Sequence, residues 1–136
     1  MPIARSPGGM RVEVQPRIAP LRRVLVVDDD ARSRSAVARL LEEEGYAAAV
    51  ASDGEEAASM LAALRPDLVL TDLTMPRLDG LGLLAHVRRM LPDTPVIILS
   101  ARAGPDVVAG AEAQGFLSKP VHVEELLARI RALIGP

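Results

Sequence analysis

The chain has 136 residues, of which 49% are hydrophobic and 25% are charged, so a protein disordered throughout and a fibrous repeat are both excluded. Only 1% of the residues are aromatic and the net charge is -2, which argues against a nucleic-acid surface. There is no cysteine, and the longest hydrophobic runs fall far short of the roughly 20 residues of a membrane span, so we expect a cytoplasmic protein without membrane contact.

Residues 1–20 are expected to form a flexible N-terminal tail, and residues 21–136 a single folded domain. The tail holds four prolines and a pair of adjacent glycines, without a sustained hydrophobic period. Its arginines would suit an acidic partner, but a solvated leader is the simpler interpretation.

From residue 22 onward, short aliphatic runs alternate with segments whose hydrophobic residues recur at helical spacing. The predicted strands are 24–27, 47–51, 68–71, 96–99 and 115–117. The last predicted helix carries its buried stripe on Leu126, Leu127, Ile130, Leu133 and Ile134. Strands that are hydrophobic throughout are buried on both faces, so the sequence predicts an α/β fold: a doubly wound, five-stranded parallel sheet with helices on both faces.

Helix boundaries are marked by a few residues. Gly45 is placed to close the first helix in a left-handed conformation, and Pro66 to end the second. Ser52 and Glu55 have the spacing of a capping box before the second helix.

Polar residues follow four of the five predicted strands, at the sheet edge where ligands bind in open parallel sheets. The first strand is followed by Asp28, Asp29 and Asp30, the third by Asp72, the fourth by Ser100 and the fifth by Lys119. The second strand ends in ASDG, which we interpret as a helix cap.

Carboxylates that converge at one edge repel one another, and a cation relieves this repulsion. Mg²⁺ suits the position because it accepts one or two carboxylates and leaves room for phosphate oxygens. Lys119 and Ser100 would complete a site for a phosphoryl group, and a nucleophilic Asp72 would then form an aspartyl phosphate. Asp30 is more simply a helix N-terminal charge.

The segments VLVVDDD, TDLTMPRLDG, VIILSA and GFLSKP follow one another in this order, each at the end of a predicted strand. With these segments the chain resembles the response-regulator receiver domains of bacterial two-component signalling over residues 22–135, in the manner of single-domain chemotaxis receivers. The resemblance implies a flavodoxin-like strand order 2-1-3-4-5, with the active crevice between the first and third strands.

The resemblance also implies the residue roles. Asp72 would accept phosphate from a sensor histidine kinase or a phosphotransfer protein. The protein would not act as an enzyme on other substrates. Asp29 would bind Mg²⁺ directly, Asp28 would assist through a water or as a second acid, and the backbone carbonyl of Thr74 would complete the protein ligands. Lys119 would pair with the phosphoryl group.

Signalling to a downstream protein would pass through a switch pair, in which the Ser100 hydroxyl moves toward the phosphate and the Phe116 ring moves into the vacated space. The family more often has threonine and tyrosine at these two positions. The segment between them is shorter than the family pattern, and its glycines and proline weaken the fourth helix. A homodimer through the fourth and fifth elements, common in the family, would involve this altered region.

Two alternatives remain open. Asp28 and Asp30 have the two-acid spacing of a small haloacid-dehalogenase-type phosphatase, and Ser100 and Lys119 follow in its order. Against this reading, Arg32 stands where that family needs threonine or valine, and the aspartate after the third strand would have no role. A receiver-like binding module that is never phosphorylated is the other alternative, and the intact set of acids argues against it.

Overall fold

The computed structural model describes residues 4–5, 11–12, 21–101 and 113–136. Its central sheet is built from β3 (Arg23–Val27), β4 (Ala47–Ala51), β5 (Leu68–Asp72), β6 (Val96–Ser100) and β7 (Gly115–Ser118). These strands are parallel and lie in the order β4-β3-β5-β6-β7, which confirms the predicted order 2-1-3-4-5.

Two short strands precede the sheet in the chain, β1 (Ala4–Arg5) and β2 (Arg11–Val12), and they pair antiparallel. The rest of the predicted tail lies outside the described residues, so the division at residue 20 stays a prediction.

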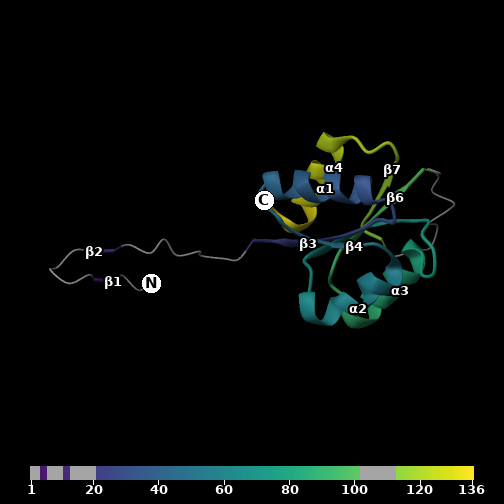
Figure 1. Cartoon of the computed structure of the whole chain (residues 1–136), viewed down its shortest axis with the longest axis horizontal. Helices are drawn as coiled ribbons and strands as arrows, with labels where there is room; N and C mark the ends of the chain where they lie inside the picture. The colour runs from purple at the N-terminus through teal and green to yellow at the C-terminus, as the bar shows by residue number, and fades with distance from the viewer. Residues whose placement is uncertain (1–3, 6–10, 13–20, 102–112) are drawn as a thin grey trace.

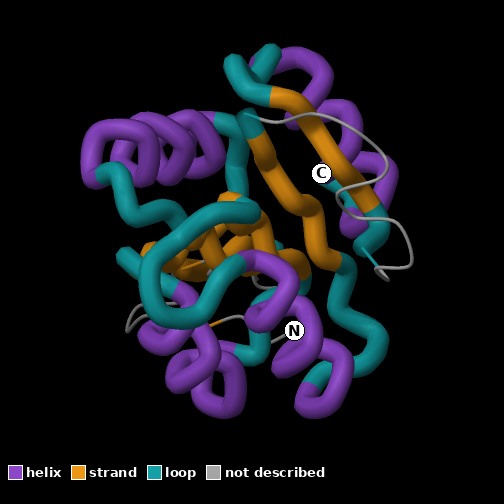
Figure 2. The backbone as a smooth tube through the Cα atoms, turned by 90° about the vertical axis from the view of Figure 1, so that its right-hand side faces the viewer, coloured by secondary structure: helices purple, strands orange, loops and turns teal. Residues whose placement is uncertain are grey.

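In the described part of the chain, four helices flank the sheet: α1 (Ala31–Glu43), α2 (Gly54–Leu64), α3 (Gly80–Met90) and α4 (Val123–Ile134). Figure 1 shows α1 and α4 on one face of the sheet and α2 and α3 on the other. Figure 2 shows the strands running between these two helical layers. The predicted weak helix after β6 falls on residues 102–112, outside the described part of the chain.

Among the described residues the core forms two clusters, one on each face of the sheet, because successive side chains of a strand point to opposite faces. Both are mainly aliphatic, and the aromatic Tyr46 is buried in the cluster on the α1 and α4 side. In β3, Val24 and Val26 face the α1 and α4 side, while Leu25 and Val27 face α2 and α3. Leu133 is 36% exposed, so its predicted burial on the α4 stripe is wrong. A step of about 100° per residue places it at the rim of that stripe.

The helix ends follow the predicted signals with one shift. Gly45 adopts φ +95° after α1, and Pro66 follows the end of α2. The N-cap of α2, however, is Asp53, whose Oδ1 accepts from the Glu56 amide at 2.8 Å. The expected capping pair of Ser52 and Glu55 is therefore wrong by one position, since the first helical residue is Gly54.

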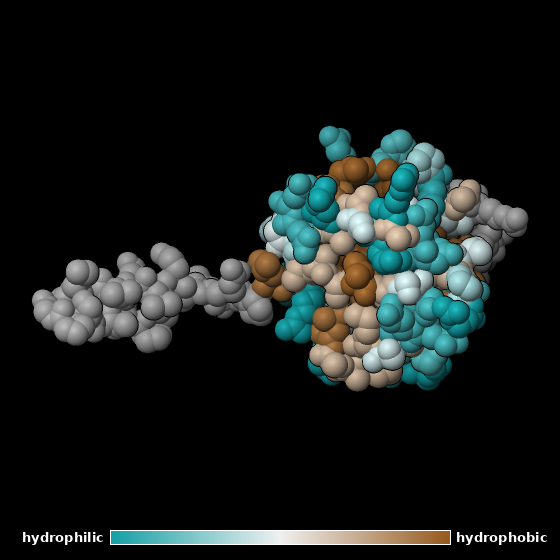
Figure 3. All heavy atoms as spheres, in the orientation of Figure 1, coloured by the Kyte–Doolittle hydropathy of each residue, from teal (hydrophilic) through white to brown (hydrophobic). Residues whose placement is uncertain are grey.

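Asp30 and Asp79 likewise cap helices: each accepts a backbone hydrogen bond from the first turn, of α1 and α3 respectively. On the face seen in Figure 3, hydrophobic areas lie between hydrophilic side chains. Large hydrophobic side chains that remain exposed are Leu21, Val50, Met90, Val123 and Leu133. Within the described ranges, none of the helices has the length and hydrophobicity needed to cross a membrane.

Candidate functional site

Three aspartates meet at the carboxyl edge of the sheet. β3 and β5 are neighbours, with Val27 opposite Thr71, so the residues that end each strand arrive together. Asp28, Asp29 and Asp72 each offer a carboxylate oxygen, and these oxygens all lie within 4.8 Å of one another. The predicted convergence of the three acids is thus present in the structure.

Backbone contacts fix Asp28 within this cluster. Its Oδ1 accepts from the Asp30 amide at 2.8 Å, and its own amide donates to the Ala51 carbonyl at 3.2 Å. The Arg34 guanidinium on α1 donates to the Asp28 carbonyl at 2.8 Å. Sequence reasoning missed Arg34, because no pattern marks which surface arginine of a helix reaches back to a strand end.

Lys119 lines the same pocket and contacts one of its aspartates. Its Nζ is 2.7 Å from Asp72 Oδ1, and its backbone amide donates to the Ser100 carbonyl at 2.8 Å. Apart from this ion pair, Asp72 Oδ1 is buried and has no hydrogen-bond donor among the described residues. The Lys119 side chain remains about one-third exposed, at 32%.

The charges in the pocket shift one another's ionisation. The pKa of Asp72 is raised from 3.8 to about 7, mainly by burial and secondly by the nearby Asp28, while Lys119 acts in the opposite direction. The pKa of Lys119 is also raised: burial disfavours its ammonium, but the contact with Asp72 outweighs burial. A buried carboxylate that ionises so reluctantly, next to two further acids, fits a hard divalent cation such as Mg²⁺.

The pocket around these groups has a volume of about 460 Å³. It is lined by Asp28, Asp29, Asp30, Asp72, Thr74, Leu99, Ser100, Ala101 and Lys119. Thr74 and Ser100 therefore lie at the pocket, as the sequence predicts for them.

Phe116 is not among the residues that line the pocket. It is half-buried and packs on the α2 and α3 side of the core. Phe116 on β7 is paired in register with Ile98 on β6, so these two side chains point to the same face of the sheet. Ser100 lies two residues after Ile98 on β6, and its side chain therefore shares that face with Phe116.

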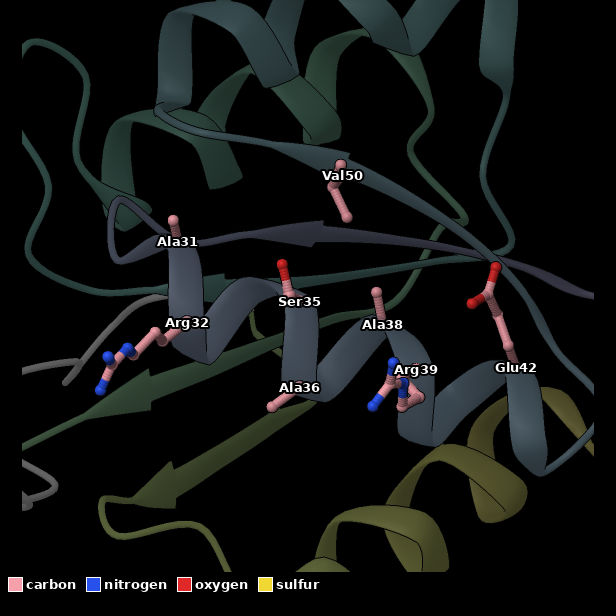
Figure 4. Close-up of a pocket in the computed structure, with 8 residues that line it drawn as sticks. All are labelled: Ala31, Arg32, Ser35, Ala36, Ala38, Arg39, Glu42 and Val50. Atoms are coloured by element: carbon pink, nitrogen blue, oxygen red, sulfur yellow. The ribbon is translucent and has the colours of Figure 1, made fainter.

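A separate groove lies on the surface along α1 and beside Val50 of β4 (Figure 4). Its volume, about 680 Å³, exceeds that of the acidic pocket. Alanines from α1 form much of its wall, together with Arg32, Arg39 and Glu42. None of the three clustered aspartates lines this groove, so its larger size does not make it the site of chemistry.

Comparison with known proteins agrees with this geometry. Residues 24–131 match the family described as the response regulator receiver domain. The response regulator MprA of Mycolicibacterium vanbaalenii is 46% identical over 115 residues, which are 82% of this chain and 50% of that protein. The chain thus spans about half the length of the curated relatives it matches.

Solved structures show the same similarity. The chemotaxis protein CheY4 of Vibrio cholerae is 29% identical, with a TM-score of 0.79 over 84% of this chain and 99% of that one. The response regulator TrrA of Thermotoga maritima, solved in complex with Mg²⁺ and BeF, is 31% identical, with a TM-score of 0.77 over 83% and 99%.

Proposed function

The chain belongs to the response-regulator receiver family, and we propose that it accepts a phosphoryl group on Asp72 and signals by a change of conformation. The observation that carries this proposal is the acidic cluster, in which oxygens of Asp28, Asp29 and Asp72 lie within 4.8 Å while Lys119 contacts Asp72 at 2.7 Å. Receiver domains obtain phosphoryl groups from histidine kinases, so we take a sensor kinase or a phosphotransfer protein as the donor.

In the transfer, a carboxylate oxygen of Asp72 forms a bond to phosphorus while the bond from phosphorus to the donor's histidine nitrogen breaks. The nitrogen leaves with the bonding electron pair and the product is an aspartyl phosphate. Such a reaction depends on positioning and on neutralising the phosphoryl oxygens. Lys119 contacts the Asp72 carboxylate and Ser100 lines the same pocket, so we expect both to bind these oxygens.

The proposed metal ligands are Asp29, Asp28 and Asp72, with the backbone carbonyl of Thr74. When bound there, Mg²⁺ would neutralise negative charge shared by the carboxylates and the phosphoryl group. Asp28 is held by backbone hydrogen bonds, so its carboxylate keeps its place whether or not the exposed Asp29 moves.

We propose that phosphorylation changes the conformation of the pair Ser100 and Phe116, which share a face of the sheet. This change would be recognised by an unidentified downstream protein. Formation of a homodimer through the elements after β6 belongs to the same proposal. The site of action would be the cytoplasm. The phosphatase alternative is not favoured, because it leaves Asp72 without a role at the centre of the cluster. A binding module without phosphorylation would not require an acid at position 72 that is buried next to Asp28, where burial and then Asp28 raise its pKa.

The test is incubation of the protein with Mg²⁺ and acetyl phosphate, followed by intact mass measurement. Wild type is expected to gain one phosphoryl group, and Asp72→Asn to gain none. Asp79→Asn is the matched control: it lies on the same loop, keeps an oxygen to cap α3, and does not line the pocket. Labelling that survives in Asp72→Asn, or that persists in EDTA without divalent ions, would refute the proposal.

A further inference from the structure

An ion pair joins two loops at the end of the sheet. Arg77, on the loop after β5, donates from Nη2 to Asp53 Oδ2, on the loop after β4. The other oxygen of Asp53 accepts from the Glu56 amide and caps α2. One carboxylate therefore fixes the start of α2 and the neighbouring loop at the same time.

The packing beneath this ion pair is close. Gly54, the first residue of α2, lies directly under the backbone of Leu78, and a Cβ at Gly54 would clash with the Leu78 carbonyl. Arg77 itself has φ +66°, a left-handed backbone conformation that residues other than glycine rarely adopt. The loop is thus held on α2 by an ion pair and by a contact that only glycine allows.

The same loop is attached to the acidic pocket at its other end. It begins at Leu73, directly after Asp72, and the Gly80 amide donates to the Leu73 carbonyl at 2.8 Å. A Cβ at Gly80 would clash with the Asp72 carbonyl, so the loop returns to the strand end that it left. Thr74, between these points, lines the pocket.

We propose that Asp53 and Arg77 are positioning residues for the metal site: their ion pair clamps the loop of residues 73–79 onto α2 and thereby holds Thr74 at the acidic pocket. Neither side chain lines the pocket, so the pair acts through the loop. The clamp, which rests on the Mg²⁺ site of the proposed function, sets how tightly the protein binds Mg²⁺. Since α2 and α3 lie side by side on one face (Figure 1), the loop connects the pocket to that helical layer.

Two single variants break the clamp, and a third serves as their control. Asp53→Asn keeps a side-chain oxygen to cap α2 but loses the charge that Arg77 contacts. Arg77→Gln removes the cation. The matched control is Arg65→Gln at the other end of α2: Arg65 is exposed, also left-handed at φ +47°, and has no ion pair in the described part of the chain.

The measurement is the dissociation constant for Mg²⁺ by isothermal titration calorimetry on the whole chain, with acetyl phosphate labelling across Mg²⁺ concentrations beside it. Both clamp variants are expected to raise the dissociation constant about tenfold. Labelling at saturating Mg²⁺ is expected to stay within about twofold of wild type, since no reacting group is altered. The double variant should bind no more weakly than either single one, because both remove the same interaction.

Net charge separates the clamp from a general electrostatic effect. Arg77→Gln removes a positive charge and would strengthen Mg²⁺ binding by charge alone, whereas Asp53→Asn would weaken it. Opposite shifts in the two variants, or shifts no larger than in Arg65→Gln, would overturn the inference. Arg77→Lys keeps the cation and is expected to restore most of the affinity; it carries the test with Arg77→Gln if Asp53→Asn does not fold. If wild type itself binds no Mg²⁺, the proposed function fails rather than the clamp.

Discussion

Asp72→Asn is expected to stabilise the protein without Mg²⁺ at neutral and higher pH, while leaving its stability near pH 4 almost unchanged. In the folded protein Asp72 holds its proton up to a pKa of about 7, whereas 3.8 is the ordinary value that applies on unfolding. Between these two values the unfolded chain binds fewer protons, so the stability of wild type falls as the pH rises. Asparagine mimics the protonated acid and carries no such cost.

The size of the effect follows from the shift. A rise from 3.8 to about 7 is about 3 pKa units, and at about 1.36 kcal/mol per unit this sets an upper limit of about 4 kcal/mol above pH 7. Solvent reaches the pocket past the exposed Asp29, and its screening lowers the expected gain to about 2 kcal/mol. The cost arises mainly from burial and secondly from Asp28, so it disappears only when the charge on Asp72 is removed or compensated.

Urea unfolding followed by circular dichroism, with EDTA present, measures this gain between about pH 5 and pH 8. Fluorescence is unsuitable because the chain lacks tryptophan. Asp93→Asn, at an exposed aspartate in a turn outside the pocket, is the matched control and should change little. An equal gain in stability at both ends of this pH range, or a loss throughout it, would show that the cost does not come from ionising the buried Asp72.

Three further substitutions test other parts of the structure. Lys119→Ala is expected to lower acetyl phosphate labelling by about 100-fold while the protein stays folded, because an ammonium aimed at the phosphoryl group is lost; near-normal labelling would contradict that role. Gly80→Ala should lower the free energy of unfolding in urea by about 2 kcal/mol or more, since the new Cβ would clash with the Asp72 carbonyl. Gly82→Ala is the control and should cost far less, because its Cβ would clash with the end of the flexible Leu78 side chain rather than with backbone. Tyr46→Phe removes a hydroxyl that donates at 2.8 Å to the carbonyl of Gly135, just after α4. The variant should lower the free energy of unfolding by about 1 kcal/mol and speed amide hydrogen exchange in α4. No change in either quantity would show that the hydrogen bond does not form in solution.

The sheet and the acidic cluster could be predicted because backbone topology alone determines them. Each strand is a continuous hydrophobic run, and parallel strands bring their carboxyl ends to one edge. Asp28 and Asp72 are far apart in the sequence, yet both follow such a run, so their meeting required no knowledge of side-chain conformations. Lys119 at the end of β7 was found in the same way. The metal was predicted from the repulsion between these carboxylates. The phosphoryl donor and the switch pair came from the family resemblance instead.

Contacts made by long side chains across loops could not be predicted. ASDG after the second strand indicated a helix cap, and Asp53 does cap α2, but nothing in that motif shows that its second oxygen reaches Arg77, 24 residues away. The partner of an arginine depends on several rotatable bonds and on the path of the loop that carries it. The left-handed φ of Arg77 is equally hidden, because glycine or asparagine is the usual signal for that conformation.

These two levels of predictability correspond to two kinds of control over the site. The aspartates at the strand ends are placed by sheet register, and a substitution can move them only by disturbing β3 or β5. Thr74 is placed by a loop, and that loop can be loosened at Asp53 or Arg77 without touching the sheet or the core. With such a clamp, metal affinity can vary between proteins that have the same acidic cluster. The variation would come from residues that neither bind the metal nor adjoin its ligands in the sequence. Mg²⁺ affinity in the Asp53 and Arg77 variants would therefore change while the pH dependence of stability contributed by Asp72 stays as in wild type, and a parallel change in both would show that the loop and the strand end are not separable.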